Sequence, residues 1–211
     1  MTPRGRVFHA EELSSKGRYQ LLTSLVVPRP IGWLSTHVPA GSPNLAPFSF
    51  YTALSSSPML VGISIGLRDG GPKDTLRNIR RSGAFCVNVV GENLLEVMNE
   101  TATEFGPEVD EASHVGLSLA DGEVVDAPYV AEAPAVLECT LYREIPLEEA
   151  GADFVIGKVE AVHLAEELQI VPGTRYVDPA TFRPVGRLHG RAYGMLGEVR
   201  FLHRGGSGDG S

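Results

Sequence analysis

The chain has 211 residues, 43% hydrophobic and 21% charged, with a formal net charge of −8. This length and composition are those of an ordinary globular protein with one substantial core. The negative charge argues against a nucleic-acid binder, which carries a basic surface. No apolar run reaches the roughly 18 residues that span a bilayer, and the first residues lack the apolar core of a signal peptide. We therefore expect a cytoplasmic protein that binds neither nucleic acid nor membrane.

The chain divides into a lead-in (1–18), one main domain (19–204) and a tail (205–211) of mostly glycine and serine. The tail has too few apolar side chains to order itself and is expected to be flexible. A first helix is predicted over Ser15–Leu25, because apolar side chains recur there every third residue from Tyr19 onward.

Most of the remaining pattern predicts β-structure. Runs of apolar residues bounded by Pro, Gly, Ser and Asn indicate strands, at Ile31–His37, Leu45–Ala53, Met59–Ile65, Ala84–Val90, Ala135–Arg143, Phe154–Leu164 and Met195–Leu202. Pro47 falls inside the second run and cannot donate a ladder hydrogen bond, so that strand is expected at an edge or with a bulge. Cys86 and Cys139 lie in two of these runs, show no CxxC spacing and are expected to be buried reduced thiols.

Two further helices are short. One is predicted at Thr75–Arg81 with Asp74 as N-cap, and the other at Asn93–Ala102. The stretch 165–192 is expected to be mostly loop. Many strands with few short helices predict a mostly β fold, closed into a small barrel.

Several residues are candidates for binding an anion. The predicted helix start at Lys73 and Thr75 offers free N–H groups, a full positive charge and a hydroxyl, which together suit a phosphate. Arg29 is a second phosphate candidate, because a guanidinium can hold a phosphate with two hydrogen bonds. Ser35 and Thr36, two small hydroxyls at the far end of a predicted strand, suit an anionic, polyhydroxylated ligand; the alternative is plain capping of a strand end.

Five segments, in this order, resemble the flavin-reductase-like family of FMN-binding split β-barrels. They read VVPRPIGWLST, NLAPFSFY, PMLVGISIG, KDTLRNI and SGAFCVNV, within Val26–Thr36, Asn44–Tyr51, Pro58–Gly66, Lys73–Ile79 and Ser82–Val89. The resemblance covers most of the chain, from about 19 to 193. It implies a split β-barrel homodimer with FMN at or near the dimer interface.

The resemblance also implies the function and part of the site. Asn44, Ser49 and Phe50 correspond to the loop that wraps the flavin ring in this family. Arg187 and Tyr193 form a later cluster with His189, where relatives often have two adjacent glycines. His189 either places an imidazole near the substrate side of the flavin or is a surface histidine.

The implied activity is oxidoreduction: hydride passes from NAD(P)H to the flavin, and electrons pass on to oxygen, free flavin or an organic acceptor. There is no G-x-G-x-x-G after a strand, but in this family the nicotinamide stacks on the flavin without its own domain. The first alternative is a non-catalytic FMN-binding or flavin-storage protein. The second alternative is a serine hydrolase, because Gly62–Gly66 matches the G-x-S-x-G pattern around Ser64. That motif requires a sharp turn from strand into helix, whereas Ser64 lies in a strand of alternating pattern. Ser64 is therefore expected to point its hydroxyl toward the cofactor. The histidines show no metal-ligand spacing.

Overall fold

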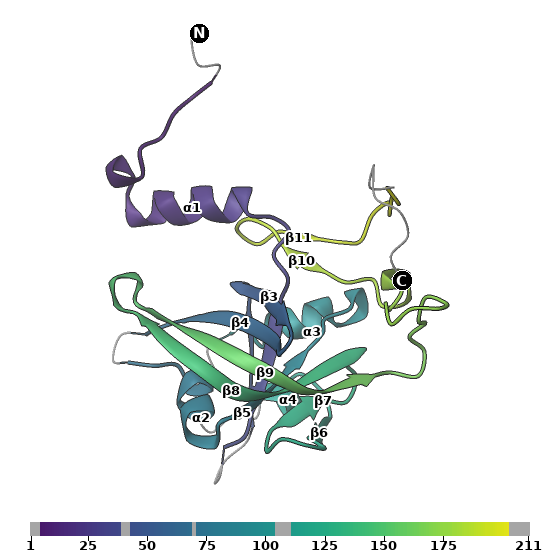
Figure 1. Cartoon of the computed structure of the whole chain (residues 1–211). Helices are drawn as coiled ribbons and strands as arrows, with labels where there is room; N and C mark the ends of the chain where they lie inside the picture. The colour runs from purple at the N-terminus through teal and green to yellow at the C-terminus, as the bar shows by residue number, and fades with distance from the viewer. Residues whose placement is uncertain (1–4, 39–42, 69–70, 104–110, 203–211) are drawn as a thin grey trace.

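Figure 1 shows the computed structural model, which describes residues 5–38, 43–68, 71–103 and 111–202. The predicted tail at 205–211 lies outside the described residues. The fold is mostly β with a few short helices, as the sequence predicts.

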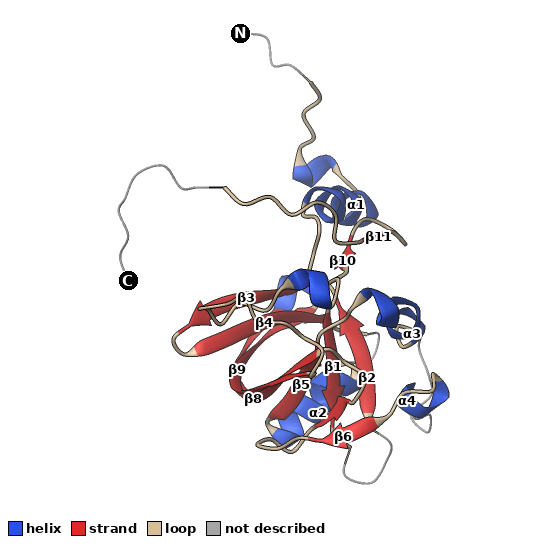
Figure 2. Cartoon of the chain, turned by 90° about the vertical axis from the view of Figure 1, so that its right-hand side faces the viewer, coloured by secondary structure: helices blue, strands red, loops and turns tan. Residues whose placement is uncertain are grey.

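One antiparallel sheet of seven strands forms the body of the protein. Its order is β2-β1-β5-β8-β9-β4-β3, and its strands are β1 (Gly32–Thr36), β2 (Asn44–Phe48), β3 (Tyr51–Ser56), β4 (Met59–Gly66), β5 (Ala84–Asn88), β8 (Ala135–Leu147) and β9 (Ala152–Leu164). The sheet curls strongly (Figure 2). Its two edge strands, β2 and β3, are consecutive in the chain, and the curl of the sheet allows a short bend to connect them.

The predicted strand Leu45–Ala53 is in fact two strands, which corrects that prediction. β2 ends at Phe48, where it pairs with Gly32, and after a bend the chain pairs with β4 instead, Tyr51 opposite Ile63. Pro47 lies on the edge strand β2, as its missing N–H requires. The bend carries Ser49 and Phe50, two of the predicted flavin contacts.

Alternate residues of the central strands fill two separate cores. Trp33 packs with Cys86 in one cluster, while Leu34 packs with Phe85 and Cys139 in the other. Both cysteines are fully buried and free, as predicted. Burial raises the pKa of the Cys139 thiol to about 12, so the thiol stays protonated at neutral pH.

The first helix, α1, spans Ser15–Leu25, the range predicted from the sequence, and Ser14 caps it by accepting the Gly17 N–H at 3.1 Å. It packs few of its side chains: only Thr23 is buried. In Figure 1 this helix lies above the sheet, beside the β10–β11 hairpin.

Helix α2 spans Asp74–Ser82, so Lys73 is the N-cap residue and the prediction of Asp74 in that position is wrong. Asp74 is the first helical residue, and its carboxylate pairs with Arg77 one turn on. The helix ends at Gly83, whose φ of +70° is left-handed and favours glycine.

The second predicted helix is shorter than expected: a 3₁₀ turn at Glu92–Leu94 leads into α3 (Leu95–Glu100). The sequence analysis missed the small elements, which are η1 (Ala10–Glu12), α4 (Glu111–His114), β6 (Leu119–Asp121), β7 (Pro128–Val130), η3 (Glu148–Ala150), η4 (Pro179–Thr181), β10 (Gly186–Arg187) and β11 (Tyr193–Gly194).

The last predicted strand, Met195–Leu202, does not form. This segment has no regular structure, and its backbone makes no hydrogen bond to any residue that the structure describes. Its alternating apolar side chains are largely exposed, with Phe201 at 94%. The pattern is that of a strand, but the segment pairs with no strand of the described residues.

Candidate functional site

The start of α2 brings three of the predicted site residues together. Lys73, Thr75 and Asn44 line one small cavity of about 100 Å³, which we call the α2 pocket. The Thr75 hydroxyl donates to Oδ1 of Asn44 at 2.6 Å. The Lys73 ammonium lies 5.7 Å from the ring centre of Phe48, over the end of β2.

The α2 pocket has the donors that a phosphate requires. Lys73 is the N-cap residue but its side chain makes no capping hydrogen bond, so the first N–H groups of the nine-residue helix are left for another acceptor. No carboxylate of the described residues forms an ion pair with Lys73. The residues present therefore fit the phosphate of a flavin mononucleotide.

Glu111 is part of this pocket, and the sequence analysis missed it. Its carboxylate accepts hydrogen bonds from the Asn44 side chain at 3.0 Å and from the Leu45 N–H at 2.6 Å. A carboxylate in the same cavity opposes an anion. Glu111 lies 67 residues from Asn44 in the chain, so no local sequence signal could place it here.

Ser35 and Thr36 are turned into the protein and line none of the cavities described here. Both are fully buried. The Ser35 hydroxyl donates to the Pro128 carbonyl at 2.5 Å, and the Thr36 hydroxyl accepts from the Asn78 side chain at 3.0 Å. In the structure, their hydroxyl groups join β1 to its neighbours.

A second group of predicted residues gathers where β10 meets the segment before β1. The backbones of Arg29 and Arg187 form two hydrogen bonds, at 3.0 and 2.8 Å. The guanidinium of Arg29 lies 6.0 Å from the ring centre of Phe50, and that of Arg187 lies 4.5 Å from the ring centre of Tyr193. We call these four residues the arginine cluster.

Arg29 does not line the α2 pocket with Lys73. Its guanidinium is buried and donates to three backbone carbonyls: Thr23 at 2.7 Å, Val26 at 2.9 Å and Leu188 at 2.8 Å. It thereby ties the end of α1 to the β10–β11 hairpin. The predicted site residues thus form two groups, with the Ser49–Phe50 bend connecting them along the chain.

The Tyr193 hydroxyl donates to the Asn99 side chain at 2.8 Å, which fixes β11 against α3. His189 is exposed in the turn between β10 and β11. It lines an open cavity of about 580 Å³ together with residues of α1. Its position in the hairpin places it next to the arginine cluster in sequence, two residues after Arg187.

Ser64 lies in the interior of β4, opposite Phe154 of β9, and its N–H donates to the Phe50 carbonyl at 2.8 Å. A nucleophilic serine of the G-x-S-x-G type needs a sharp turn from strand into helix. Strand β4 continues through Ser64 to Gly66. The geometry therefore does not form the elbow that a serine hydrolase requires.

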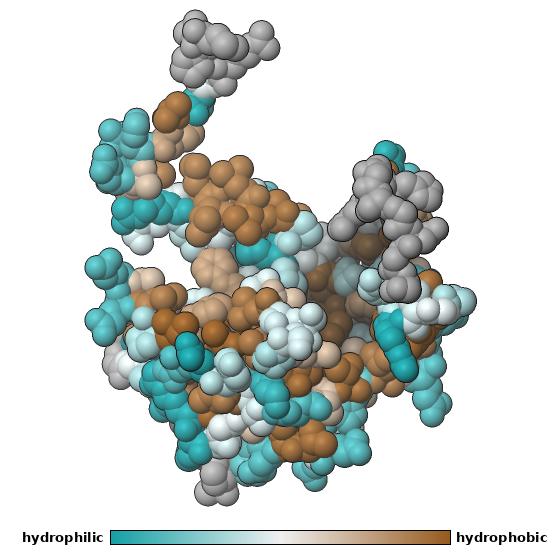
Figure 3. Space-filling view, in the orientation of Figure 1, coloured by the Kyte–Doolittle hydropathy of each residue, from teal (hydrophilic) through white to brown (hydrophobic). Residues whose placement is uncertain are grey.

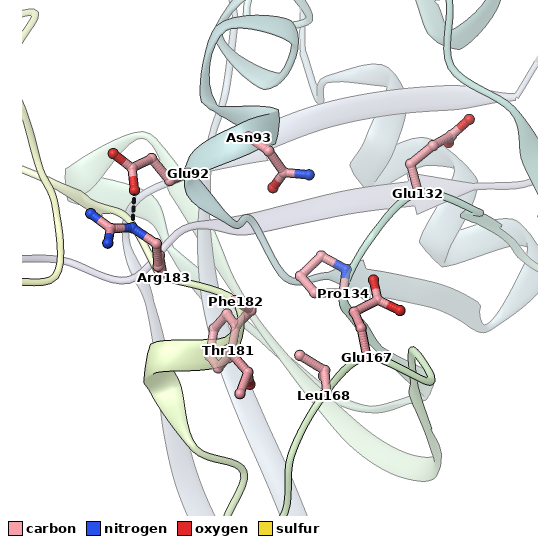
Figure 4. Close-up of a pocket in the computed structure, with 9 residues that line it drawn as sticks. All are labelled: Glu92, Asn93, Glu132, Pro134, Glu167, Leu168, Thr181, Phe182 and Arg183. Carbon is pink, nitrogen blue, oxygen red and sulfur yellow. Dashed lines mark hydrogen bonds and ion pairs between the residues drawn. The ribbon is translucent and has the colours of Figure 1, made fainter.

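A third cavity, of about 420 Å³, contains none of the predicted site residues (Figure 4). Three carboxylates line it, those of Glu92, Glu132 and Glu167. Arg183 pairs with Glu92, as the dashed line in Figure 4 marks, so the cation at its rim is already neutralised. This acidic surface does not suit a phosphate.

Within the described ranges, no three His, Cys, Asp or Glu side chains come together as a metal site. No helix in the described part of the chain is long and apolar enough to cross a membrane.

Known proteins match this chain over most of its length. A model of the flavin reductase like domain matches residues 24–177. An uncharacterized protein of Halalkalibacterium halodurans is 42% identical over 199 residues, which cover 92% of this chain and 94% of that protein. The crystal structure of nitrilotriacetate monooxygenase component B from Bacillus cereus superposes with a TM-score of 0.89 at 32% identity, over 95% of this chain and 100% of that one. A split barrel protein of the flavin reductase type from Shewanella frigidimarina superposes with a TM-score of 0.82 at 23% identity, over 95% of this chain and 100% of that one. This likeness shows that both proteins have the same fold.

Proposed function

Because this chain belongs to the flavin reductase-like family, we propose that it is an FMN-dependent oxidoreductase that takes hydride from NAD(P)H. Electrons then pass to oxygen, free flavin or an organic acceptor. The observation that carries the choice of FMN is the uncapped start of α2, where Lys73 has no carboxylate partner among the described residues. A phosphate is the ligand that this arrangement favours.

The proposal gives each group of residues a task. Lys73 and the first N–H groups of α2, that of Thr75 among them, hold the phosphate. The Thr75 hydroxyl donates to Asn44, and Asn44 with the Leu45 N–H holds the carboxylate of Glu111. The bend at Ser49 and Phe50 supports the flavin ring, partly through backbone groups. Bound FMN would supply the hydride chemistry, so no side chain needs to act as a nucleophile.

The alternative to a reductase is a flavin-storage protein, and turnover separates the two. We expect catalytic amounts of the FMN-loaded protein to oxidise NADH or NADPH repeatedly in air, because electrons can leave the flavin to oxygen. A storage protein binds FMN but consumes no more nicotinamide than a matched solution of free FMN. Parallel assays with NADH and NADPH identify the preferred donor.

The working unit is proposed to be a homodimer. Helix α1 and the residue that follows it expose apolar side chains that a single chain leaves uncovered: Tyr19, Leu22, Leu25 and Val26 are 58%, 55%, 73% and 53% exposed. Figure 3 shows this hydrophobic surface over the helix. Two-fold symmetry, the most common closed arrangement, buries the same patch on both chains.

Light scattering tests this assembly. The wild-type protein is expected to have twice the chain mass at micromolar concentration. Leu22→Glu places a charge in the proposed interface and should shift the mass toward that of one chain, whereas Lys16→Glu on the same helix should not. A wild-type protein with the mass of a single chain would show that the helix patch is not a dimer interface.

A further inference from the structure

The arginine cluster borders a cavity distinct from the α2 pocket. Its volume is about 440 Å³, within the range of small-molecule sites. It is lined by Val27, Pro28, Arg29, Pro30, Pro184, Val185, Gly186, Leu188, Gly194, Met195, Leu196 and Gly197. Arg29 is the one residue of this lining with a polar side chain, and all the others are apolar or glycine. We call this cavity the Arg29 pocket.

The charge of Arg29 has no counter-ion within the described chain. Its side chain is 6% exposed, and the partners of Nη1 and Nη2 are neutral backbone carbonyls. Its Nε–H has no acceptor among the described residues. No described carboxylate forms an ion pair with Arg29 or with its neighbour Arg187.

A buried cation without a counter-ion is unfavourable, and a second cation makes it more so. Burial lowers the pKa of the Arg29 guanidinium, Tyr19 raises it, and Arg187 lowers it further. Arginine stays charged in proteins despite such effects. The electrostatic cost is relieved most directly by an anion, and the walls around Arg29 require the rest of that anion to be apolar.

We propose that the Arg29 pocket binds a small, mainly apolar organic carboxylate. If the chain is the oxidoreductase proposed above, this carboxylate is its organic substrate. Arg29 would then hold the substrate next to Phe50, and so next to the proposed position of the flavin ring. Binding of the carboxylate does not itself depend on that function. The proposal concerns binding only, and no bond is made or broken at Arg29.

A carboxylate fits this pocket better than a phosphate. Three of the five N–H groups of the Arg29 guanidinium donate to backbone carbonyls, which leaves the buried Nε–H and one Nη2–H. This small donor set matches a monoanion held by a charge-assisted hydrogen bond. A phosphate dianion needs several donors, and the α2 pocket supplies them. The two cavities share no lining residue, so both ligands can be bound at once.

Isothermal titration with benzoate tests the proposal, on the protein with and without FMN. Benzoate is expected to bind at least about tenfold more tightly than benzamide, its neutral analogue, in both forms. Arg29→Gln should remove this preference, whereas Arg143→Gln, an exposed arginine outside the pocket, should keep it. Equal binding of benzoate and benzamide by the wild type would overturn the proposal.

A second variant leaves the charge in place, because Arg29→Gln also removes the ties between α1 and β10 and could disturb folding. At Gly194 the three atoms nearest to an added Cβ all belong to Leu188, at 3.5 to 3.7 Å, which is ordinary van der Waals contact. Gly194 and Leu188 both line the pocket, so a valine at this position is expected to fill part of it. Gly194→Val is expected to abolish benzoate binding and to leave FMN affinity unchanged. Unchanged benzoate binding in Gly194→Val, or competition between benzoate and FMN in the wild type, would show that the carboxylate does not bind in this pocket.

Absence of NAD(P)H turnover would contradict the proposed function alone, since the titrations need no turnover.

Discussion

Replacing Glu138 with alanine is expected to lower the free energy of unfolding by about 3 kcal/mol, because several buried donors lose their acceptor. The Glu138 carboxylate is fully buried in β8. It accepts the backbone N–H groups of Glu123 at 2.9 Å, Val124 at 2.8 Å and Val125 at 3.0 Å, and it also contacts His163. One side chain therefore accepts three consecutive backbone N–H groups of the turn between β6 and β7, and urea unfolding of the variant measures its contribution.

The same carboxylate makes stability depend on acid pH. Burial alone would raise the pKa of Glu138, but the hydrogen bonds from Val124, Glu123, His163 and Val125 outweigh burial, and the pKa is lowered. A carboxyl group whose pKa is lower in the folded state stabilises the fold above its unfolded pKa of about 4.3. This contribution is lost as the pH falls below that value, through the folded pKa.

Glu138→Gln separates charge from shape. It keeps the side-chain size but removes the titrating group, so its unfolding free energy should lose part of its dependence on pH below about 4.3. Glu149→Gln, at an exposed glutamate of the 3₁₀ turn η3, is the matched control and should behave as the wild type. Equal acid dependence in wild type and Glu138→Gln would contradict the role assigned to this carboxylate.

Replacing Lys73 with alanine is expected to weaken FMN binding by about 2 kcal/mol, roughly 30-fold in the dissociation constant. The variant removes the full positive charge at the start of α2 but leaves the helix N–H groups in place. Riboflavin lacks the phosphate, so it should bind equally to wild type and variant. Flavin fluorescence titration measures both ligands.

The matched control is Lys158→Ala. Lys158 pairs with Glu160 on the surface of β9 and lines none of the cavities described above. Its removal changes the net charge by the same amount as Lys73→Ala and should not change FMN affinity. If both lysine variants lose the same affinity, the effect is general electrostatics and Lys73 does not contact the phosphate.

The fold was largely predictable where the signals are local. The range of α1 followed from the spacing of apolar residues, and Ser14 is a matching local cap. Pro47 indicated an edge strand for a reason confined to its own backbone. The bend at Ser49 was not predictable, because it depends on which strand the chain pairs with on either side of it. Met195–Leu202 has the alternation of a strand, but a strand also needs a neighbouring edge, which sequence alone does not supply.

The same distinction holds for the candidate site. Lys73 and Thr75 were predicted together because they are neighbours at one helix start. The Thr75–Asn44 hydrogen bond and the presence of Glu111 in the same pocket depend on how β2 and α4 pack against α2, which no local pattern reveals. Arg29 was predicted to be an anion ligand, but its guanidinium is held partly by the carbonyl of Leu188, 159 residues away. That distant contact places Arg29 in a pocket separate from Lys73.

Anaerobic mixing of the FMN-loaded protein with NADH and with NADPH tests the proposed function most directly. Loss of the oxidised flavin absorbance reports hydride transfer without any electron acceptor. We predict that at least one of the two nicotinamides bleaches the bound flavin completely and much faster than it reduces free FMN under the same conditions. Bound flavin that stays oxidised, or that is reduced no faster than free FMN by either nicotinamide, would contradict the assignment as an oxidoreductase and favour a flavin-storage protein.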